Sequence, residues 1–130
     1  MLLQNRKSEE IPLSLDDTDF TGKRVLVVGG SSGIGNGIAQ AFHVRGAEVH
    51  VWGTRAKASD YAAAEGSDLE GLVYQQVDVG SPDAIEAASL DFDSLDCLVL
   101  SQGIVVYKRG EFENPDWDKV MAVNLDSLMH

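Results

Sequence analysis

Apolar residues along the chain follow two alternating patterns, short unbroken runs and longer stretches at helical spacing. An unbroken run such as 25–28 is typical of a strand buried on both faces. A stretch in which apolar residues recur every three or four positions, such as 34–45 before Gly46, indicates a helix. Strands are predicted at residues 25–28, 49–52, 71–77 and 95–100. Helices are predicted at 34–45, at 56–65, from Ser81-Pro82 to Leu90 and from Asn114-Pro115 to Leu128.

Strands that alternate with helices predict an α/β fold of parallel β-α-β units. Right-handed crossovers arrange about four strands in the order 3-2-1-4, as in a Rossmann-type three-layer αβα fold with a doubly wound sheet. The strand order reverses between strands 1 and 4, so a ligand crevice is expected at their carboxyl ends. Residues 20–130 are predicted to form this one domain, and residues 1–19 a polar lead-in.

The amino-acid composition limits which binding partners and which cellular compartment are expected. The chain has 130 residues, of which 44% are hydrophobic, and this is enough for one domain with a core. Its 10 basic and 21 acidic residues give a net charge of -11, which argues against a nucleic-acid duplex or a membrane surface as partner. The single cysteine, Cys97, lies in an apolar run and is predicted to be a buried thiol in a reducing, cytoplasmic setting. The charged amino terminus is expected to be neither a signal peptide nor a membrane span.

A glycine-rich turn between the first strand and the first helix is the strongest candidate for chemistry. Residues 28–35 read VGGSSGIG, with Gly29, Gly33 and Gly35 spaced as G-x3-G-x-G. Glycines let such a turn tighten and let a phosphate group approach the backbone, while the helix start supplies unpaired N–H groups. The turn therefore predicts a site for a phosphate-bearing ligand, and the alternative is a tight turn that binds nothing.

These residues, and others downstream, resemble the short-chain dehydrogenase/reductase family in register over residues 20–130. The family's T-G-x-x-x-G-I-G is present with Val28 in place of threonine, and its D-V after strand 3 is Asp78-Val79. Its N-N-A-G is Leu100-Ser101-Gln102-Gly103, which keeps only the glycine, and its V-N-L is Val123-Asn124-Leu125. The resemblance implies a truncated Rossmann NAD(P)-binding domain. It also implies hydride transfer between a nicotinamide and a carbonyl or alcohol substrate.

The resemblance further implies roles for individual residues. Asn124 matches the family's catalytic-tetrad asparagine, and Asp78 matches the aspartate that contacts the adenine. The alternatives are a turn cap for Asp78 and an ordinary buried amide bonded to backbone for Asn124. His43 and His50 have no partner at metal spacing, so no metal site is expected. The implied cofactor-binding residues are Gly29, Ser31, Ser32, Gly33, Ile34, Gly35, Thr54, Arg55, Asp78, Val79, Ser101 and Gly103.

The choice of cofactor depends on the end of the second strand. A carboxylate there would bind the ribose 2′-hydroxyl of NAD and repel the 2′-phosphate of NADP. This chain instead has Gly53 followed by Thr54, which can donate a hydrogen bond, and Arg55, which can pair with a phosphate. Against this, Ser32 stands where many NADP-preferring members of the family carry a basic residue. The balance favours NADP, with NAD as the alternative.

The family's proton-transfer residues, a serine and a Tyr-x-x-x-Lys pair, find no match in the chain. The residue four positions after each tyrosine is Glu65 for Tyr61, Asp78 for Tyr74 and Glu111 for Tyr107. The leading hypothesis is therefore the cofactor-binding half of a short-chain oxidoreductase that forms a homo-oligomer. The alternatives are a non-catalytic dinucleotide-binding module and a remnant that pairs with another chain through an open apolar edge at Leu98-Val99-Leu100.

Overall fold

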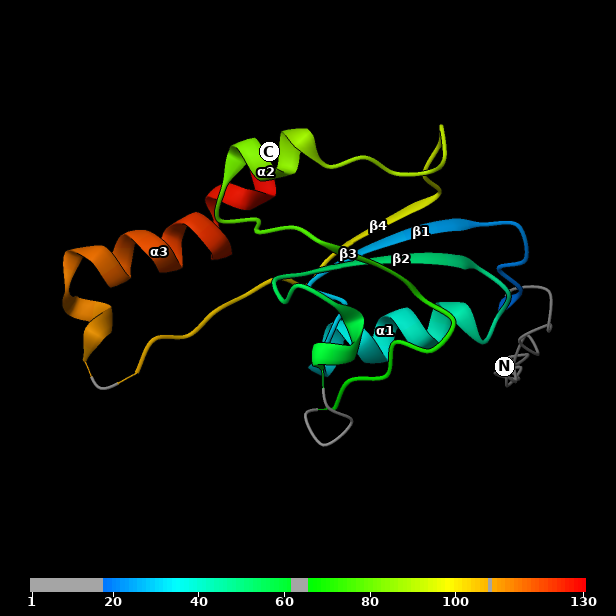
Figure 1. Ribbon diagram of the computed structural model, residues 1–130, viewed down its shortest axis with the longest axis horizontal. Coiled ribbons are helices and arrows are strands. Elements are labelled where there is room, and N and C mark those ends of the chain that lie inside the picture. The colour runs from blue at the N-terminus through cyan, green and yellow to red at the C-terminus, as the bar shows by residue number, and fades with distance from the viewer. Residues whose placement is uncertain (1–17, 62–65, 108) are drawn as a thin grey trace, which may run out of the picture.

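The computed structural model describes residues 18–61, 66–107 and 109–130. The strands are β1 (Arg24–Val28), β2 (Glu48–Gly53), β3 (Val73–Gln76) and β4 (Cys97–Leu100), and the helices are α1 (Gly33–His43), α2 (Pro82–Ala87) and α3 (Asn114–Asn124). The strands form one parallel sheet in the order β3-β2-β1-β4, which confirms the predicted topology. α1 lies on one face of the sheet and α2 on the other, whereas α3 extends away from both (Figure 1).

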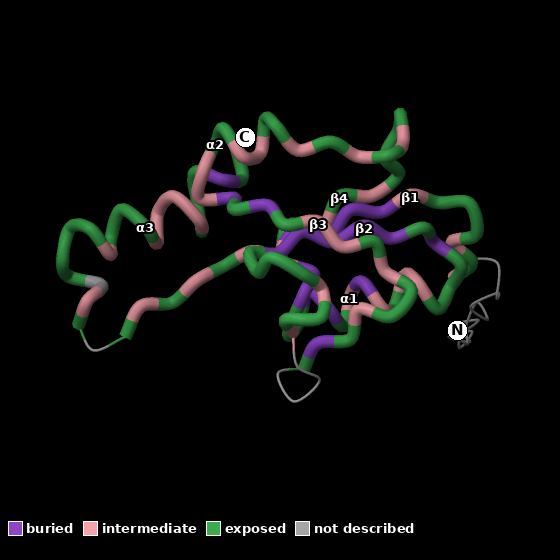
Figure 2. The backbone as a smooth tube through the Cα atoms, in the orientation of Figure 1, coloured by how far each residue is buried: buried purple, intermediate pink, exposed green. Residues whose placement is uncertain are grey.

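β1 lies at the centre of the sheet and contributes side chains to both faces. Val25 and Val27 are fully buried on the face covered by α1, where they pack with Val49, Val51 and Ala39. Leu26 and Val28 are buried on the opposite face with Trp52, Val77 and Val79, and Ile85 of α2 packs against this second cluster. Figure 2 shows the buried backbone concentrated along β1 and β2. The unbroken apolar run therefore marks a strand buried on both faces, as predicted.

Several element ends differ from their predicted positions. β3 begins at Val73 rather than residue 71, because Gly71 has a φ of 75° and belongs to a turn. β4 begins at Cys97 rather than residue 95. α2 begins at Pro82, as predicted, and the Ser81 hydroxyl accepts a hydrogen bond from the Ala84 N–H at 3.3 Å. It ends at Ala87 rather than residue 90, because the backbone of Ala88 is extended.

Two predicted helices are wrong in extent. In the stretch 56–65 the described residues form only a 3-10 turn at Ala58–Asp60, and residues 62–65 lie outside the described part of the chain. The last helix was expected to reach Leu128, but Leu125 has φ −125° and ψ −61°, which ends α3 at Asn124. A 3-10 turn at Asp126–Met129 follows. Most of the predicted lead-in, residues 1–17, also lies outside the described residues.

β4 has a strand neighbour on one side only among the described residues. Its Leu98 and Leu100 side chains are 51% and 47% exposed. Cys97 is half-buried, so the prediction of a buried thiol is wrong, because an edge strand is covered less than a central one. α3 has no buried residue in the described structure, and its Trp117 is 55% exposed. The chain therefore presents apolar surface along β4 and α3.

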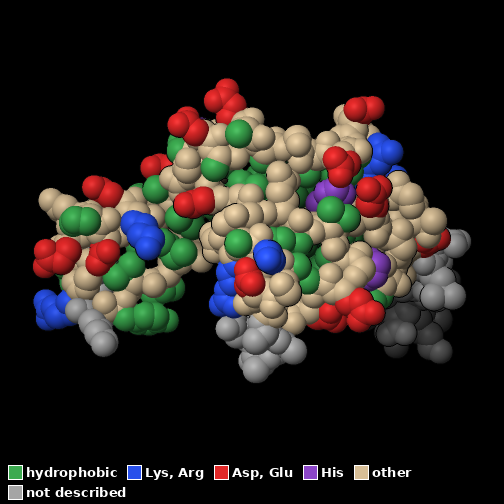
Figure 3. Space-filling model, in the orientation of Figure 1, with side chains coloured by type: hydrophobic (Ala, Val, Ile, Leu, Met, Phe, Trp, Pro, Cys, Tyr) green, Lys and Arg blue, Asp and Glu red, His purple; other side chains and the backbone are tan. Residues whose placement is uncertain are grey.

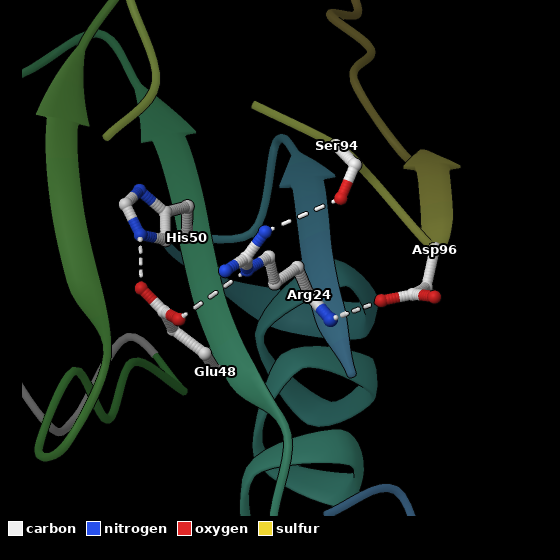
Figure 4. A network of polar contacts seen from close by, with 5 residues as sticks. All are labelled: Arg24, Glu48, His50, Ser94 and Asp96. Carbon is white, nitrogen blue, oxygen red and sulfur yellow. Dashed lines mark hydrogen bonds and ion pairs between the residues drawn. The ribbon is translucent and has the colours of Figure 1, made fainter. Parts of the chain in front are cut away.

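The amino ends of the strands carry a network of polar side chains (Figure 4). The Arg24 N–H donates to the Asp96 carboxylate at 2.8 Å, and the Arg24 guanidinium donates to the Ser94 hydroxyl at 3.2 Å. Glu48 lies between two partners, with its oxygens 4.0 Å from Nε of Arg24 and 3.4 Å from Nε2 of the buried His50. These groups therefore satisfy one another at this end of the sheet.

Acidic side chains are spread over the face of the molecule shown in Figure 3. They agree with the net charge of -11 and with the absence of any extended basic patch on that face. Among the described residues, no helix combines the length and the apolar character that a membrane span requires.

Candidate functional site

A cleft of about 510 Å³ opens at the carboxyl ends of the strands. Its volume falls in the range of small-molecule sites, and it lies where the strand order reverses between β1 and β4. Ten of the predicted site residues line it: Gly29, Ser31, Ser32, Ile34, Gly35, Thr54, Arg55, Val79, Ser101 and Gly103. Eight further residues complete the lining: Val28, Trp52, Gly53, Tyr61, Val77, Gln102, Ile104 and Val123.

The glycine turn lines the cleft, and nearby backbone atoms require glycine at two of its positions. A Cβ on Gly35 would lie 2.2 Å from the Gly29 carbonyl oxygen, and a Cβ on Gly29 would lie 2.8 Å from the Ser101 carbonyl oxygen. Gly33 differs, because its Cβ position meets no atom within 4 Å while its φ of 55° disfavours any other residue. The backbone is therefore closely packed around Gly29 and Gly35, whereas the space beside Gly33 is open.

The first residues of α1 leave backbone N–H groups without a partner in the helix. Ile34 and Gly35 follow the first helical residue and have no carbonyl one turn earlier within α1. The N-cap residue, Ser32, makes no side-chain capping hydrogen bond. The Gly33 N–H, in contrast, donates to the Gly66 carbonyl at 3.1 Å. Unpaired N–H groups and the positive end of the helix dipole favour an anion at this position.

A buried asparagine, which the sequence analysis did not identify, fixes the turn. The Asn36 amide nitrogen donates to the Gly30 carbonyl at 3.1 Å and to the Asp68 carbonyl at 2.7 Å. Its amide oxygen accepts the Asp68 N–H at 2.9 Å. A polar residue on the buried side of a helix is the signal that marks such an anchor. Asn36 thus joins the turn to the segment that precedes β3.

The cleft differs in charge from the rest of the chain. The chain has 21 acidic residues, yet none of the described residues that line the cleft is aspartate or glutamate. Arg55 is the lining residue with a positive charge, and its guanidinium carbon lies 4.7 Å from the centroid of the Tyr61 ring. A cleft that excludes carboxylates and holds an arginine suits an anionic ligand.

Two tyrosines support the strand end beside Arg55. The Tyr61 and Tyr74 rings meet edge to face with centroids 5.7 Å apart, and the Tyr61 hydroxyl accepts the Arg55 N–H at 3.3 Å. Burial raises the pKa of Tyr74, and its hydrogen bond with Tyr61 raises that pKa further. Burial acts in the same direction on Tyr61, but hydrogen bonds led by those with Ser31 and Tyr74 outweigh it and lower the pKa of Tyr61.

Three predicted site residues do not line the cleft. Gly33 uses its N–H within the protein, as described above. Asp78 is exposed, and its carboxylate accepts the Gly80 N–H at 2.9 Å, so in this structure it caps a turn. Asn124 is exposed rather than buried, and its amide pairs with both the N–H and the carbonyl of Ile104 at 2.8 and 2.9 Å. Because Ile104 lines the cleft, the Asn124 amide here holds a backbone segment of the cleft lining in place.

Gln102 contributes a buried acceptor to the lining. Its amide nitrogen donates to the Ser127 hydroxyl at 3.0 Å, whereas its buried amide oxygen has no hydrogen-bond partner in the described structure. A buried acceptor of this kind is available to a donor group on a ligand. The described residues contain no cluster of three or more His, Cys, Asp or Glu side chains that could hold a metal ion.

Known proteins are similar to this chain in sequence. The family model for short chain dehydrogenases matches residues 23–130. Nodulation protein G from Rhizobium sp. (strain N33) is 36% identical over 117 residues, which are 85% of this chain and 46% of that protein. The 3-oxoacyl-acyl-carrier-protein reductase FabG from Chlamydia pneumoniae is 32% identical over 123 residues, 88% of this chain and 48% of the reductase. The chain spans about half the length of the curated relatives it matches.

Solved structures agree with the sequence relatives. A dehydrogenase/reductase from Sinorhizobium meliloti 1021 superposes with a TM-score of 0.68 and 30% identity, covering 88% of this chain and 48% of that one. The strand order, the cleft at the switch point and the family match over residues 23–130 point to one conclusion. The chain belongs to the short-chain dehydrogenase family.

Proposed function

We propose that this chain binds NADP(H) in the cleft and forms the cofactor-binding part of a short-chain dehydrogenase/reductase. The bound nicotinamide gives or takes a hydride in exchange with a carbonyl or alcohol substrate. One observation carries the proposal: the chain is strongly acidic, yet the described lining of its cleft contains no carboxylate, and the start of α1 lies in that lining. This combination favours a ligand with phosphate groups.

Each part of the cleft suits one part of the dinucleotide. The N–H groups of Ile34 and Gly35, at the start of α1, suit the pyrophosphate. The apolar side chains of Val79 and Ile104 shield bound rings from water. Arg55 carries the charge that suits a 2′-phosphate, and Gly53 leaves the end of β2 without a carboxylate. These features favour NADP over NAD.

The same proposal includes a carbonyl substrate and assembly of the chain into a homo-oligomer. The name of the Chlamydia pneumoniae relative, a 3-oxoacyl reductase, supports a carbonyl substrate. No Tyr-x-x-x-Lys pair occurs in the 130 residues, so this chain binds and orients the cofactor without moving the proton itself. The exposed apolar residues of β4 and α3 suit a homo-oligomer, and the half-buried thiol of Cys97 suits a reducing, cytoplasmic setting.

Isothermal titration calorimetry of the 130-residue chain with NADP⁺ and NAD⁺ tests the proposal. We expect one binding site per chain, with NADP⁺ bound more tightly. Absence of binding by either dinucleotide, in a sample shown to be folded by circular dichroism, would overturn the proposal. Tighter binding of NAD⁺ would keep the cleft as a dinucleotide site and overturn the choice of cofactor.

A second candidate function is a non-catalytic module that pairs with another chain. The observation that favours it is the exposure of Leu98 and Leu100 on the edge strand β4. Such a module would form a dimer that persists on dilution and would bind no dinucleotide. Analytical ultracentrifugation over a range of concentrations, together with the calorimetry above, separates the two functions.

A further inference from the structure

The loop after β2 holds a tyrosine against the cleft. A Cβ built on Gly53 would lie 2.5 Å from the hydroxyl oxygen of Tyr61 and 2.6 Å from the hydroxyl oxygen of Ser31. The two hydroxyls also form a hydrogen bond with each other. Contacts this short do not occur between real side chains, so position 53 accepts no side chain while Tyr61 and Ser31 keep their places.

The same tyrosine holds Arg55 in place. Its hydroxyl accepts the Arg55 backbone N–H at 3.3 Å, and its ring lies under the guanidinium at 4.7 Å from the centroid to the guanidinium carbon. On the other side, the Tyr74 hydroxyl donates to the Arg55 carbonyl. The Arg55 guanidinium also donates to the Asp60 carbonyl, within the same loop. Arg55 is thus restrained at its backbone and at its side chain.

We propose that Tyr61 is a specificity-determining residue of the nucleotide site, an inference that rests on the proposed function. With Ser31, its hydroxyl excludes a carboxylate at the end of β2, the group that would favour the ribose 2′-hydroxyl of NAD. Its ring positions the Arg55 guanidinium for a 2′-phosphate. Discrimination between the two cofactors therefore depends on this loop, and an aspartate at Gly53 alone does not reverse it.

Calorimetry with NADP⁺ and NAD⁺ tests the inference on the 130-residue chain and three variants. Tyr61→Ala is expected to weaken NADP⁺ binding about tenfold, because Arg55 is then no longer held in place before the ligand binds, and to leave NAD⁺ binding within about twofold. Tyr61→Phe keeps the ring and is expected to lose less. Tyr107→Ala, which changes an exposed tyrosine outside the cleft lining, is expected to alter neither.

Equal weakening of both cofactors by Tyr61→Ala would overturn the inference and leave the proposed function in place. Binding of neither cofactor by the unchanged chain would overturn the proposed function and the inference with it. These two failures are therefore distinguishable in the same experiment.

The Tm of a double variant tests, without any cofactor, whether the Tyr61 hydroxyl blocks a side chain at position 53. Gly53→Asp is expected to lower Tm in the chain that keeps Tyr61, and to lower it less in the Tyr61→Ala background, where only the Ser31 contact remains. The double variant is also expected to bind NAD⁺ more tightly than NADP⁺. Equal losses of Tm in the two backgrounds, or an unchanged cofactor preference in the double variant, would overturn the inference.

Discussion

The two ends of the sheet handle their polar groups in opposite ways. At the amino ends of the strands, charged side chains such as Arg24, Glu48 and Asp96 pair with one another (Figure 4). At the carboxyl ends, backbone N–H groups, uncharged polar side chains and the Arg55 guanidinium surround a cleft whose described lining has no carboxylate. An end whose groups already have partners has little to offer a ligand. The comparison therefore supports the proposed binding site at the carboxyl end.

The difference follows from the direction of a parallel sheet. Each crossover sends the chain from a strand's carboxyl end into a following segment, so the start of α1 meets the end of β1. The positive end of the helix dipole then lies at the same edge as the glycine turn. At the amino ends of the strands, charged side chains form hydrogen bonds and ion pairs with their neighbours.

The largest expected effect is that of Gly35→Val, which disrupts the glycine turn at the carboxyl end of the sheet. Even a Cβ at this position would lie 2.2 Å from the Gly29 carbonyl, so the turn and the start of α1 must move apart. We expect a loss of about 3 kcal/mol or more in the free energy of unfolding, and loss of NADP⁺ binding. Chemical denaturation and calorimetry measure the two effects.

Gly37→Ala is the matched control, because the Cβ position of Gly37 in the same helix has no atom within 4 Å. Alanine is the better helix former by about 1 kcal/mol, so the control is expected to raise stability and to leave NADP⁺ binding unchanged. Equal NADP⁺ affinity in Gly35→Val and the unchanged chain would contradict the placement of the pyrophosphate.

A second large effect concerns hydride transfer. The carboxyl end provides N–H groups for a cofactor, but the chain contains no Tyr-x-x-x-Lys pair, and the Asn124 amide does not shuttle protons at neutral pH. General acid–base assistance is typically worth ~10²–10⁴ in rate. We expect no measurable oxidation of NADPH by the 130-residue chain with a panel of carbonyl compounds, followed by absorbance. Turnover at ordinary enzyme rates would contradict this.

The charge at the cleft is tested by Arg55→Ala. Loss of one charge-assisted contact to a 2′-phosphate is expected to weaken NADP⁺ binding about 10- to 100-fold, with a much smaller effect on NAD⁺. Lys57→Ala removes an exposed positive charge two positions along the chain, outside the cleft lining, and is expected to change neither affinity. Similar losses in both variants would show that general charge, rather than Arg55 itself, selects the cofactor.

A smaller effect is expected at the side of the sheet. Leu98 is exposed on the edge strand β4, and we expect the chain to self-associate through this edge and the apolar face of α3. Leu98→Lys should shift light scattering toward the monomer without changing NADP⁺ affinity. Val44→Lys makes the same change at an exposed valine just after α1 and should leave association unchanged. A monodisperse monomer before any substitution would contradict the prediction.

The smallest effect is expected at the amino end. Asp96→Ala removes the acceptor of the Arg24 N–H and an ion pair with Lys23 at 3.7 Å. The free energy of unfolding should fall by about 1 kcal/mol, seen as a few degrees in Tm. NADP⁺ affinity should not change, because Asp96 precedes the amino end of β4 and is not among the residues that line the cleft. A large loss of affinity would show that the two ends are coupled rather than separate.

The sequence predicted the fold well because its signals are periodic. The apolar run of β1 and the helical spacing of α1 each depend on many residues, so their type and order were predicted correctly. The ends of elements depend on single residues, and an end was predicted wrongly where the backbone conformation of one residue stops the element. Leu125, for example, leaves the helical backbone region and ends α3 earlier than the apolar spacing indicates.

The candidate site was predictable only where it follows a motif. The glycine turn and Arg55 lie next to strand ends in the sequence, and both line the cleft. Tyr61 and Asn36 reach the cleft or its turn from positions with no motif, because tertiary packing alone brings their side chains there. The roles inferred for Asp78 and Asn124 come from resemblance, and their contacts here are with backbone.

The most direct test of the account is the mapping of NADP⁺ binding on backbone amides by nuclear magnetic resonance. The unchanged 130-residue chain is titrated while the amide signals of both ends of the sheet are followed. The account predicts the largest shifts at residues 31–35 and 53–55, and none at Arg24, Glu48 and Asp96. Shifts confined to the amino end, or no shift at residues 31–35 at saturating NADP⁺, would contradict it.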